Sequence, residues 1–355
     1  MPVTIPPFYC PIPPRLRPDA EEIDRASFSW FAALNACDDD ELGYLDRSRC
    51  GLVSAWGMPD AAAGRVRIAA DIMYLAEALD DTAFETGRLG RSPEEAMAFL
   101  TQLARVVEAP ETPLLLGNPW AEGVRDMRRR VGGFTTPLQL QRWICGWQRL
   151  FFGLAWEASV RARELSPGLD EYVMIRVLGH TIGMEILTTL NDAADGYELT
   201  HAELNGLPVR ALTEMNWMLI SFDNDLYSYH QESARHPNGL NFVDVIARDL
   251  RCTPAEAVPH VVAMRDRVMS LFLALRAKTA ATASENLKRY LESLGQWLRA
   301  NIDWGTTSER YLKPFGPDSP PETWAALPTV YADGPSDAAL EPIPVPVVSW
   351  WWGLL

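Results

Sequence analysis

Long helical stretches dominate the sequence between Asp19 and Tyr311 and restrict the chain to an all-α fold. Apolar residues recur there with the spacing of one helix face, and the alternating runs that strands require are scarce. Ser92-Pro93-Glu94-Glu95 and Thr253-Pro254-Ala255-Glu256 each combine a capping residue, a proline at the first helical position and acid in the first turn. We expect long helices around residues 68–84, 137–164, 169–190, 209–235 and 255–279.

The two ends of the chain differ in composition from this helical region. Residues 1–19 are rich in proline, which fixes φ and cannot donate a helical hydrogen bond. Residues 316–355 are rich in proline and small residues and contain three successive tryptophans. The sequence therefore predicts a strap over 1–19, one helical domain over 20–315 and an irregular tail over 316–355. We expect the tryptophans to pack on the body or to form a lid.

The charge of the chain argues against nucleic acid as a partner. Its 47 acidic and 32 basic side chains give a net charge of -15, whereas a phosphate backbone needs a basic surface. An anionic substrate would need metal cations as a bridge, although solubility alone also accounts for the charge.

Several features indicate a cytoplasmic protein. The five scattered cysteines form no CxxC pair, so they predict neither a disulfide framework nor a zinc site. The N-terminus lacks the features of a signal peptide, and no stretch reaches about 18 uninterrupted apolar residues. We expect no stable insertion into a membrane. The oligomeric state stays open, with a homodimer as one option.

An acidic pair, Asp80 and Asp81, ends an apolar helical run and is followed by Glu85. Adjacent carboxylates at this end of a helix are unfavourable because they repel each other and the helix dipole opposes negative charge. Mg²⁺ offsets that cost, since it binds a few carboxylates together with phosphate oxygens and water. The alternative reading is a solvated helix end.

A second polar set occurs about 140 residues later. Asn224, Ser228 and Glu232 are spaced at i, i+4 and i+8, so their oxygen atoms share one helix face and can hold a hard cation. The same face continues into Trp217, which indicates that it points to an interior rather than to solvent. Asp225 is expected to point elsewhere.

These two sets resemble the motifs of a known family. DDTAFE, at residues 80–85, and NDLYSYHQE, at residues 224–232, resemble the aspartate-rich and NSE motifs of bacterial class I terpene synthases. Arg310-Tyr311 resembles the RY pair of that family, and Arg176 matches its diphosphate-sensing arginine. Phe8-Tyr-Cys-Pro-Ile-Pro13 resembles its N-terminal strap. The resemblance covers nearly the whole helical region.

The resemblance implies a single-domain antiparallel helical bundle with three Mg²⁺ ions at the mouth of an apolar cavity. Such an enzyme is a lyase that ionises a linear prenyl diphosphate, cyclises the carbocation to a terpene and releases diphosphate. The implied metal ligands are Asp80, bridging two ions with support from Asp81 and Glu85, and Asn224, Ser228 and Glu232 for the third ion. The implied diphosphate contacts are Arg176 and Arg310, and Tyr311 would help to close the site.

Physical chemistry agrees with these roles. The charge that grows on a departing diphosphate needs preorganised cations, and guanidinium groups suit its geometry. The carbocation needs a dry pocket with aromatic walls. Trp217 and Trp304 are the candidates for such walls, and each could equally be plain core.

The sequence departs from the family near the diphosphate. Gln231 stands where the family usually has a basic residue, so one donor to the diphosphate is weaker or comes from elsewhere. Gly179 and His180 stand at the linker and effector positions after Arg176, with a shifted register over 181–183 as the alternative.

A further departure concerns the length of the substrate. Glu77 and Ala76 stand before Asp80 where sesquiterpene cyclases often have aromatic residues. Smaller groups there would widen the pocket, which favours geranylgeranyl diphosphate over farnesyl diphosphate. The alternative is a sesquiterpene cyclase that acts on farnesyl diphosphate.

Two other classes compete with this hypothesis. A chain-elongating prenyltransferase would carry a second acidic run in place of Asn224, Ser228 and Glu232. A non-catalytic helical binding protein would use its acidic stripes only as solvated faces.

Overall fold

The computed structural model describes residues 3–178, 181–235, 240–313, 316, 318–320, 323, 325, 327–328 and 331–355, without the side chain of Arg235. Regular structure in these residues is helical, apart from one isolated parallel bridge between Tyr9 and Ala332, so the predicted all-α fold is confirmed. The chain divides into two compact units. The amino-terminal unit comprises Arg15–Leu165 and Gly179–Glu198, and the carboxyl-terminal unit comprises Met1–Pro14, Ser166–Leu178 and Leu199–Leu355.

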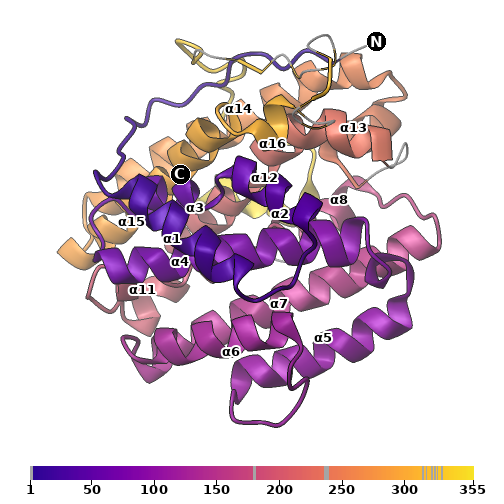
Figure 1. Ribbon diagram of the computed structural model, residues 1–355. Helices are drawn as coiled ribbons and strands as arrows, with labels where there is room; N and C mark the ends of the chain where they lie inside the picture. The colour runs from indigo at the N-terminus through magenta and orange to yellow at the C-terminus, as the bar shows by residue number, and fades with distance from the viewer. Residues whose placement is uncertain are drawn as a thin grey trace. The chain divides into compact units, whose positions relative to one another are not determined.

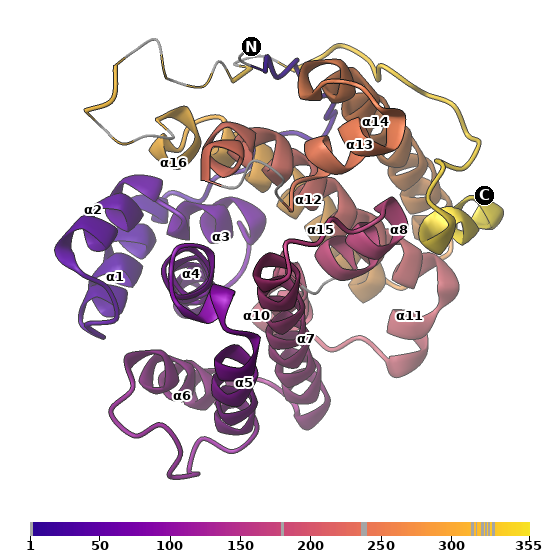
Figure 2. The same ribbon diagram turned by 90° about the vertical axis from the view of Figure 1, so that its right-hand side faces the viewer.

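The amino-terminal unit is built around a long helix, α7. Thr136 and Gln139 form a capping box that starts this helix, with Pro137 in its first turn. Its buried face carries Trp143 and Trp147, and the helix packs against α5, which also contacts α6 (Figures 1 and 2). The helices of this unit are α1 (Ala20–Ala32), α2 (Asp39–Ser48), α3 (Gly51–Gly57), α4 (Ala63–Ala78), η1 (Leu79–Glu85), η2 (Leu89–Arg91), α5 (Pro93–Glu108), α6 (Pro119–Gly132), α7 (Pro137–Ala162), α9 (Met184–Thr188) and α10 (Asn191–Ala194).

The carboxyl-terminal unit is organised by α12, which packs against α14 and α15. The predicted start of α14 is confirmed, because Thr253 and Glu256 form a capping box there, and α13 lies beside α14 (Figure 1). The helices of this unit are α8 (Leu169–Tyr172), η3 (Val173–Val177), α11 (His201–Asn205), α12 (Leu207–Arg235), α13 (Phe242–Leu250), α14 (Pro254–Ala280), α15 (Glu285–Gly305), α16 (Glu309–Leu312) and η5 (Pro346–Leu354).

Two local predictions need correction. The long helix expected over 169–190 is interrupted: η3 is a π-helix that ends at Val177, and α9 begins only at Met184. Gly183 precedes α9 with a φ of 70°, outside helical geometry, and glycines also have low helix propensity. Ser92 does precede α5, which has Pro93 in its first turn, but its side chain makes no capping hydrogen bond.

The end of the tail packs on its own unit, as predicted for the tryptophans. Trp351 and Trp352 are buried, and the indole Nε1 of Trp351 donates to Glu214 Oε2 of α12 at 3.0 Å. Lys278 of α14 donates to the carbonyl oxygen atoms of Leu354 and Leu355 at 3.0 and 2.6 Å. The segment 346–354 is a 3₁₀-helix, so the tail is less irregular than expected.

Trp351→Phe should lower the free energy of unfolding by about 1–2 kcal/mol, because the buried Glu214 loses a hydrogen-bond donor while most of the apolar contact remains. Urea denaturation measures this loss. The matched control is Trp350→Phe, at a partly exposed indole, which should stay within about 0.5 kcal/mol of wild type. Equal unfolding midpoints for the two variants would contradict the prediction.

None of the helices in the described part of the chain combines the length and the apolar character that crossing a bilayer requires.

Candidate active site

The acidic pair of the amino-terminal unit lies on a π-helical turn. The apolar helix α4 ends at Ala78, and η1 follows without a break, with the Thr86 amide donating to the carbonyl oxygen of Asp81 at 3.1 Å. Such i to i+5 bonds widen the turn, and π-helical turns are frequent at functional sites. The sequence located the acidic residues at the end of the apolar helix but did not predict this wider geometry.

Asp80 has an incompletely satisfied carboxylate. Its Oδ1 atom is buried and has no hydrogen-bond partner among the described residues. Burial, reinforced by the nearby carboxylates of Glu85 and Glu157, raises the pKa of Asp80 well above its usual value, and Arg161 opposes this shift. A buried, unpartnered carboxylate oxygen is costly to leave in that state, and a hard cation would satisfy it. Asp80 therefore fits the role of a metal ligand.

Glu157 and Arg161, on α7 of the same unit, were missed by the sequence analysis. They form an ion pair at 2.8 Å, and the Glu157 side chain is buried. An i, i+4 pair of glutamate and arginine commonly stabilises exposed helix faces, so the spacing alone gives no indication of an acidic neighbourhood around Asp80.

The second polar set lies on one face of α12 in the carboxyl-terminal unit, as predicted. The Ser228 hydroxyl donates to the carbonyl oxygen of Asn224 at 2.8 Å. The Asn224 side chain is held from both sides: Oδ1 accepts from Arg176 Nη2 at 2.7 Å, and Nδ2 donates to the Tyr311 hydroxyl at 2.8 Å. The structure thus brings together Asn224, Arg176 and Tyr311, three residues that are far apart in the sequence.

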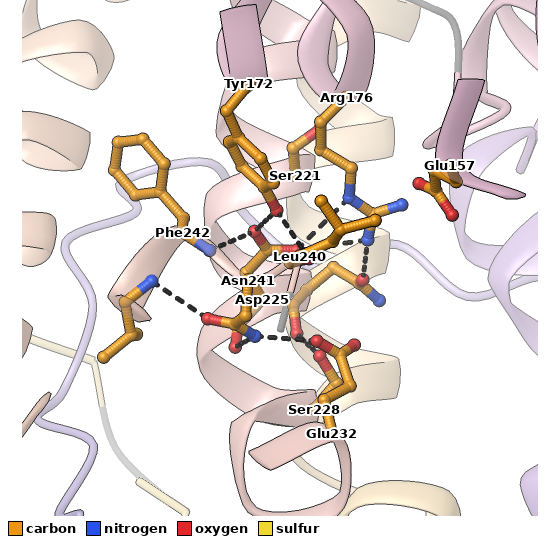
Figure 3. A network of polar contacts seen from close by, with 12 residues as sticks. Glu157, Tyr172, Arg176, Ser221, Asp225, Ser228, Glu232, Leu240, Asn241 and Phe242 are labelled. Carbon is orange, nitrogen blue, oxygen red and sulfur yellow. Dashed lines mark hydrogen bonds and ion pairs between the residues drawn. The ribbon is translucent and has the colours of Figure 1, made fainter. Parts of the chain in front are cut away.

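The Asp225 carboxylate lies beside Tyr172 and Arg176 and points away from Ser228 and Glu232, as expected (Figure 3). Its Oδ1 atom accepts from Arg176 Nη2 at 3.1 Å, and its Oδ2 atom accepts from the Tyr172 hydroxyl and, at 2.8 Å, from the Phe242 amide. Burial raises the pKa of the Asp225 carboxyl, while these donors oppose the shift. Asp225 therefore orients the arginine, a role that the motif did not reveal.

Asn241 is a further residue that sequence reasoning missed. Its Nδ2 atom donates to Glu232 Oε2 at 2.9 Å and to the carbonyl oxygen of Asp225 at 2.7 Å (Figure 3). Its Oδ1 atom accepts from the Val243 amide and caps α13. An asparagine before an apolar run is detectable as a helix cap, but its second contact depends on the tertiary fold.

The remaining predicted residues are placed as follows. Trp304, at the end of α15, meets the Tyr311 ring edge to face at a centroid distance of 5.1 Å, and the buried Arg310 guanidinium lies 5.7 Å from the same ring. Trp217 is buried on α12, and Ala76 is partly exposed on α4. Gly179 and His180 lie outside the described residues.

Across the described ranges, no three His, Cys, Asp or Glu side chains gather into a group that could hold a metal ion by themselves. The set on α12 contains one carboxylate beside an amide and a hydroxyl. Each donor set would therefore be completed by water and substrate oxygens, which is how Mg²⁺ is usually bound in proteins.

Comparison with known proteins decides the family. The sequence model described as "Terpene synthase family 2, C-terminal metal binding" matches residues 71–270, more than half of the chain. The chain is 34% identical to bonnadiene synthase of Allokutzneria albata, over 99% of this chain and 98% of that protein. It belongs to the bacterial class I terpene synthases. The family predicted from the two motifs is thereby confirmed, and the similarity supports a terpene synthase rather than a prenyltransferase or a non-catalytic protein.

Further comparisons agree with the assignment. The terpene synthase is 35% identical to (+)-T-muurolol synthase ((2E,6E)-farnesyl diphosphate cyclizing) of Streptomyces clavuligerus, over 97% of this chain and 81% of that protein. The crystal structure of the SVS_A2 protein from ancestral sequence reconstruction superimposes with a TM-score of 0.86 at 28% identity, covering 99% of this chain and 100% of that one. The matched family description supports the use of a divalent metal by this cyclase.

Proposed function

We propose that the enzyme binds a linear prenyl diphosphate with three Mg²⁺ ions, ionises it and cyclises the resulting carbocation. The observation that carries this proposal is the buried Oδ1 atom of Asp80, which has no partner among the described residues. The proposed ligands are Asp80, Asp81 and Glu85 on η1, and Asn224, Ser228 and Glu232 on α12.

Bound Mg²⁺ would supply Lewis-acid stabilisation of the departing diphosphate. Arg176 and Arg310 donate hydrogen bonds to the diphosphate in this proposal, and the planar guanidinium group suits phosphate oxygens. Trp217 and Trp304 form part of an apolar wall that excludes water, and their ring faces stabilise positive charge in the substrate. Asp225 and Asn241 hold Arg176 and Glu232 in place.

We propose geranylgeranyl diphosphate as the preferred substrate. Ala76 lies on α4, one helical turn before Asp80 of η1, and its side chain occupies less volume than an aromatic residue would. Farnesyl diphosphate is the second candidate, because it is the substrate named for the related (+)-T-muurolol synthase.

The direct test incubates the purified enzyme with Mg²⁺ and, in separate reactions, with geranyl, farnesyl or geranylgeranyl diphosphate, followed by mass analysis of hydrocarbons. The proposal expects a C20 product at the highest kcat/KM. A higher kcat/KM with farnesyl diphosphate would reject the proposed chain length and leave the reaction class intact. Turnover without divalent metal would reject the proposed chemistry.

Ala76→Phe should lower kcat/KM for geranylgeranyl diphosphate about tenfold relative to farnesyl diphosphate, because the ring occupies volume that the longer chain needs. Steady-state kinetics with both substrates measures the ratio, and the shorter substrate serves as the internal control. An equal decrease for both substrates would show that Ala76 does not select chain length.

A further inference from the structure

Two aromatic rings and one amide contact Tyr311. Trp304 meets it edge to face, and Tyr227 of α12 packs on it at a centroid distance of 5.8 Å. The Tyr311 hydroxyl accepts a hydrogen bond from Asn224 Nδ2, and Arg176 donates to the Oδ1 atom of the same amide. Because a guanidinium only donates, this pair of contacts keeps Oδ1 on the arginine side and the amide nitrogen on the tyrosine side.

The ring of Tyr227 fits only because residue 305 is glycine. A Cβ atom at Gly305 would lie 2.3 Å from Cε2 and 2.4 Å from Cδ2 of Tyr227, much closer than carbon atoms can approach. Gly305 is the last residue of α15 and has no left-handed backbone angle, so backbone conformation alone does not require a glycine there. The close approach of the Tyr227 ring is what requires a glycine at this position.

Tyr227 has little room to retreat from such a clash. Phe8 of the N-terminal strap packs on it at a centroid distance of 5.3 Å. Phe8 itself is buried under Arg265, whose guanidinium lies 5.2 Å from the phenylalanine ring and donates to Asp223 at 2.8 Å. The carbonyl oxygen of Phe8 accepts from the Ala332 amide at 3.0 Å. A displaced Tyr227 ring would therefore press on Tyr311.

We propose that Tyr227 and Gly305 are positioning residues, which hold Tyr311 in place and thereby orient the Asn224 amide for a metal ion. This inference rests on the proposed role of Asn224 as a Mg²⁺ ligand. The shape of Tyr227 carries the function rather than its hydroxyl group, because that hydroxyl is buried without a hydrogen-bond partner among the described residues.

The test measures thermal stabilisation of the full-length enzyme by inorganic diphosphate as a function of Mg²⁺ concentration. Gly305→Ala and Tyr227→Leu should each raise the Mg²⁺ midpoint about tenfold, the size typical for loss of a group that orients a metal ligand. Tyr227→Phe is the matched control and should keep the wild-type midpoint. Turnover of the two shifted variants should approach wild type at saturating Mg²⁺, which a general folding defect would not produce.

The double variant Gly305→Ala/Tyr227→Leu separates positioning from unrelated damage. Its midpoint should equal that of Tyr227→Leu alone, because leucine leaves space for the added methyl group and the two changes are coupled. A midpoint at the product of the two single shifts would overturn the inference, as would a wild-type midpoint for Gly305→Ala.

Two further outcomes are distinguishable. If the wild-type enzyme shows no Mg²⁺-dependent stabilisation by diphosphate, the proposed metal chemistry fails and the inference fails with it. If wild type responds and the variants match it, only the inference fails. Should Gly305→Ala not fold, the comparison of Tyr227→Leu with Tyr227→Phe decides alone, and equal midpoints would overturn the inference.

Discussion

Asp80→Asn is expected to lower kcat about 10²- to 10³-fold, because weaker binding of Mg²⁺ would remove a preorganised cation from the developing diphosphate anion, and losing one such electrostatic contact usually costs that much. The asparagine preserves the shape of the side chain and removes its negative charge. Steady-state kinetics at saturating Mg²⁺ measures the loss. Asp60→Asn is the control in the same unit, because Asp60 is exposed and pairs only with the exposed Arg15 in the described contacts.

The same substitution should raise the melting temperature when a chelator removes divalent metal. Burial and the neighbouring carboxylates raise the pKa of Asp80, so the ionised group destabilises the folded enzyme. The pKa of an aspartate carboxyl in the unfolded chain is near 3.9. Because the pKa of Asp80 is higher in the folded enzyme, stability is lost as the pH rises from about 3.9 through the folded-state pKa. The advantage of Asp80→Asn should therefore grow with pH above about 4.

Thermal melts of both proteins in the presence of a chelator, between pH 5 and pH 8, test whether the stability advantage of Asp80→Asn grows with pH. An advantage that shrinks as pH rises would contradict the desolvation of Asp80. Gained stability together with lost activity is the trade-off expected of a residue kept for function.

The fold followed from local sequence wherever helix chemistry decides the structure. The cap at Thr253 and the apolar periodicity of 209–235 correspond directly to the start of α14 and to α12. The apolar periodicity does not reveal the break after Val177, because the pattern of 169–190 continues across it. Periodicity reports which face is buried, but it does not report where tertiary contacts make a π-helix more stable than an α-helix.

The candidate site was predictable where its residues share one helix face. Asn224, Ser228 and Glu232 needed only the helical repeat to be placed together. Asn241 and Glu157 could not be found in that way, since each meets its charged neighbours through packing between helices. Motifs thus identify the proposed ligand-binding groups, while the residues that orient them become visible only in three dimensions.

Asp225→Asn is expected to lower the free energy of unfolding by about 3 kcal/mol, because it removes the carboxylate that pairs with the mostly buried Arg176 guanidinium. The Tyr172 hydroxyl would also donate to a neutral amide in place of a charged carboxylate. Urea denaturation without metal measures the cost.

Adding Arg176→Met to Asp225→Asn should recover part of this loss, because the double variant no longer contains the buried guanidinium that pairs with Asp225 in the wild type. A coupling of at least about 1 kcal/mol is expected between the two positions. If the two substitutions were simply additive, Asp225 would stabilise the unit only through Tyr172 and the Phe242 amide. The measured coupling therefore tells whether the aspartate next to Asn224 is kept to hold the arginine, which is the role that its geometry indicates.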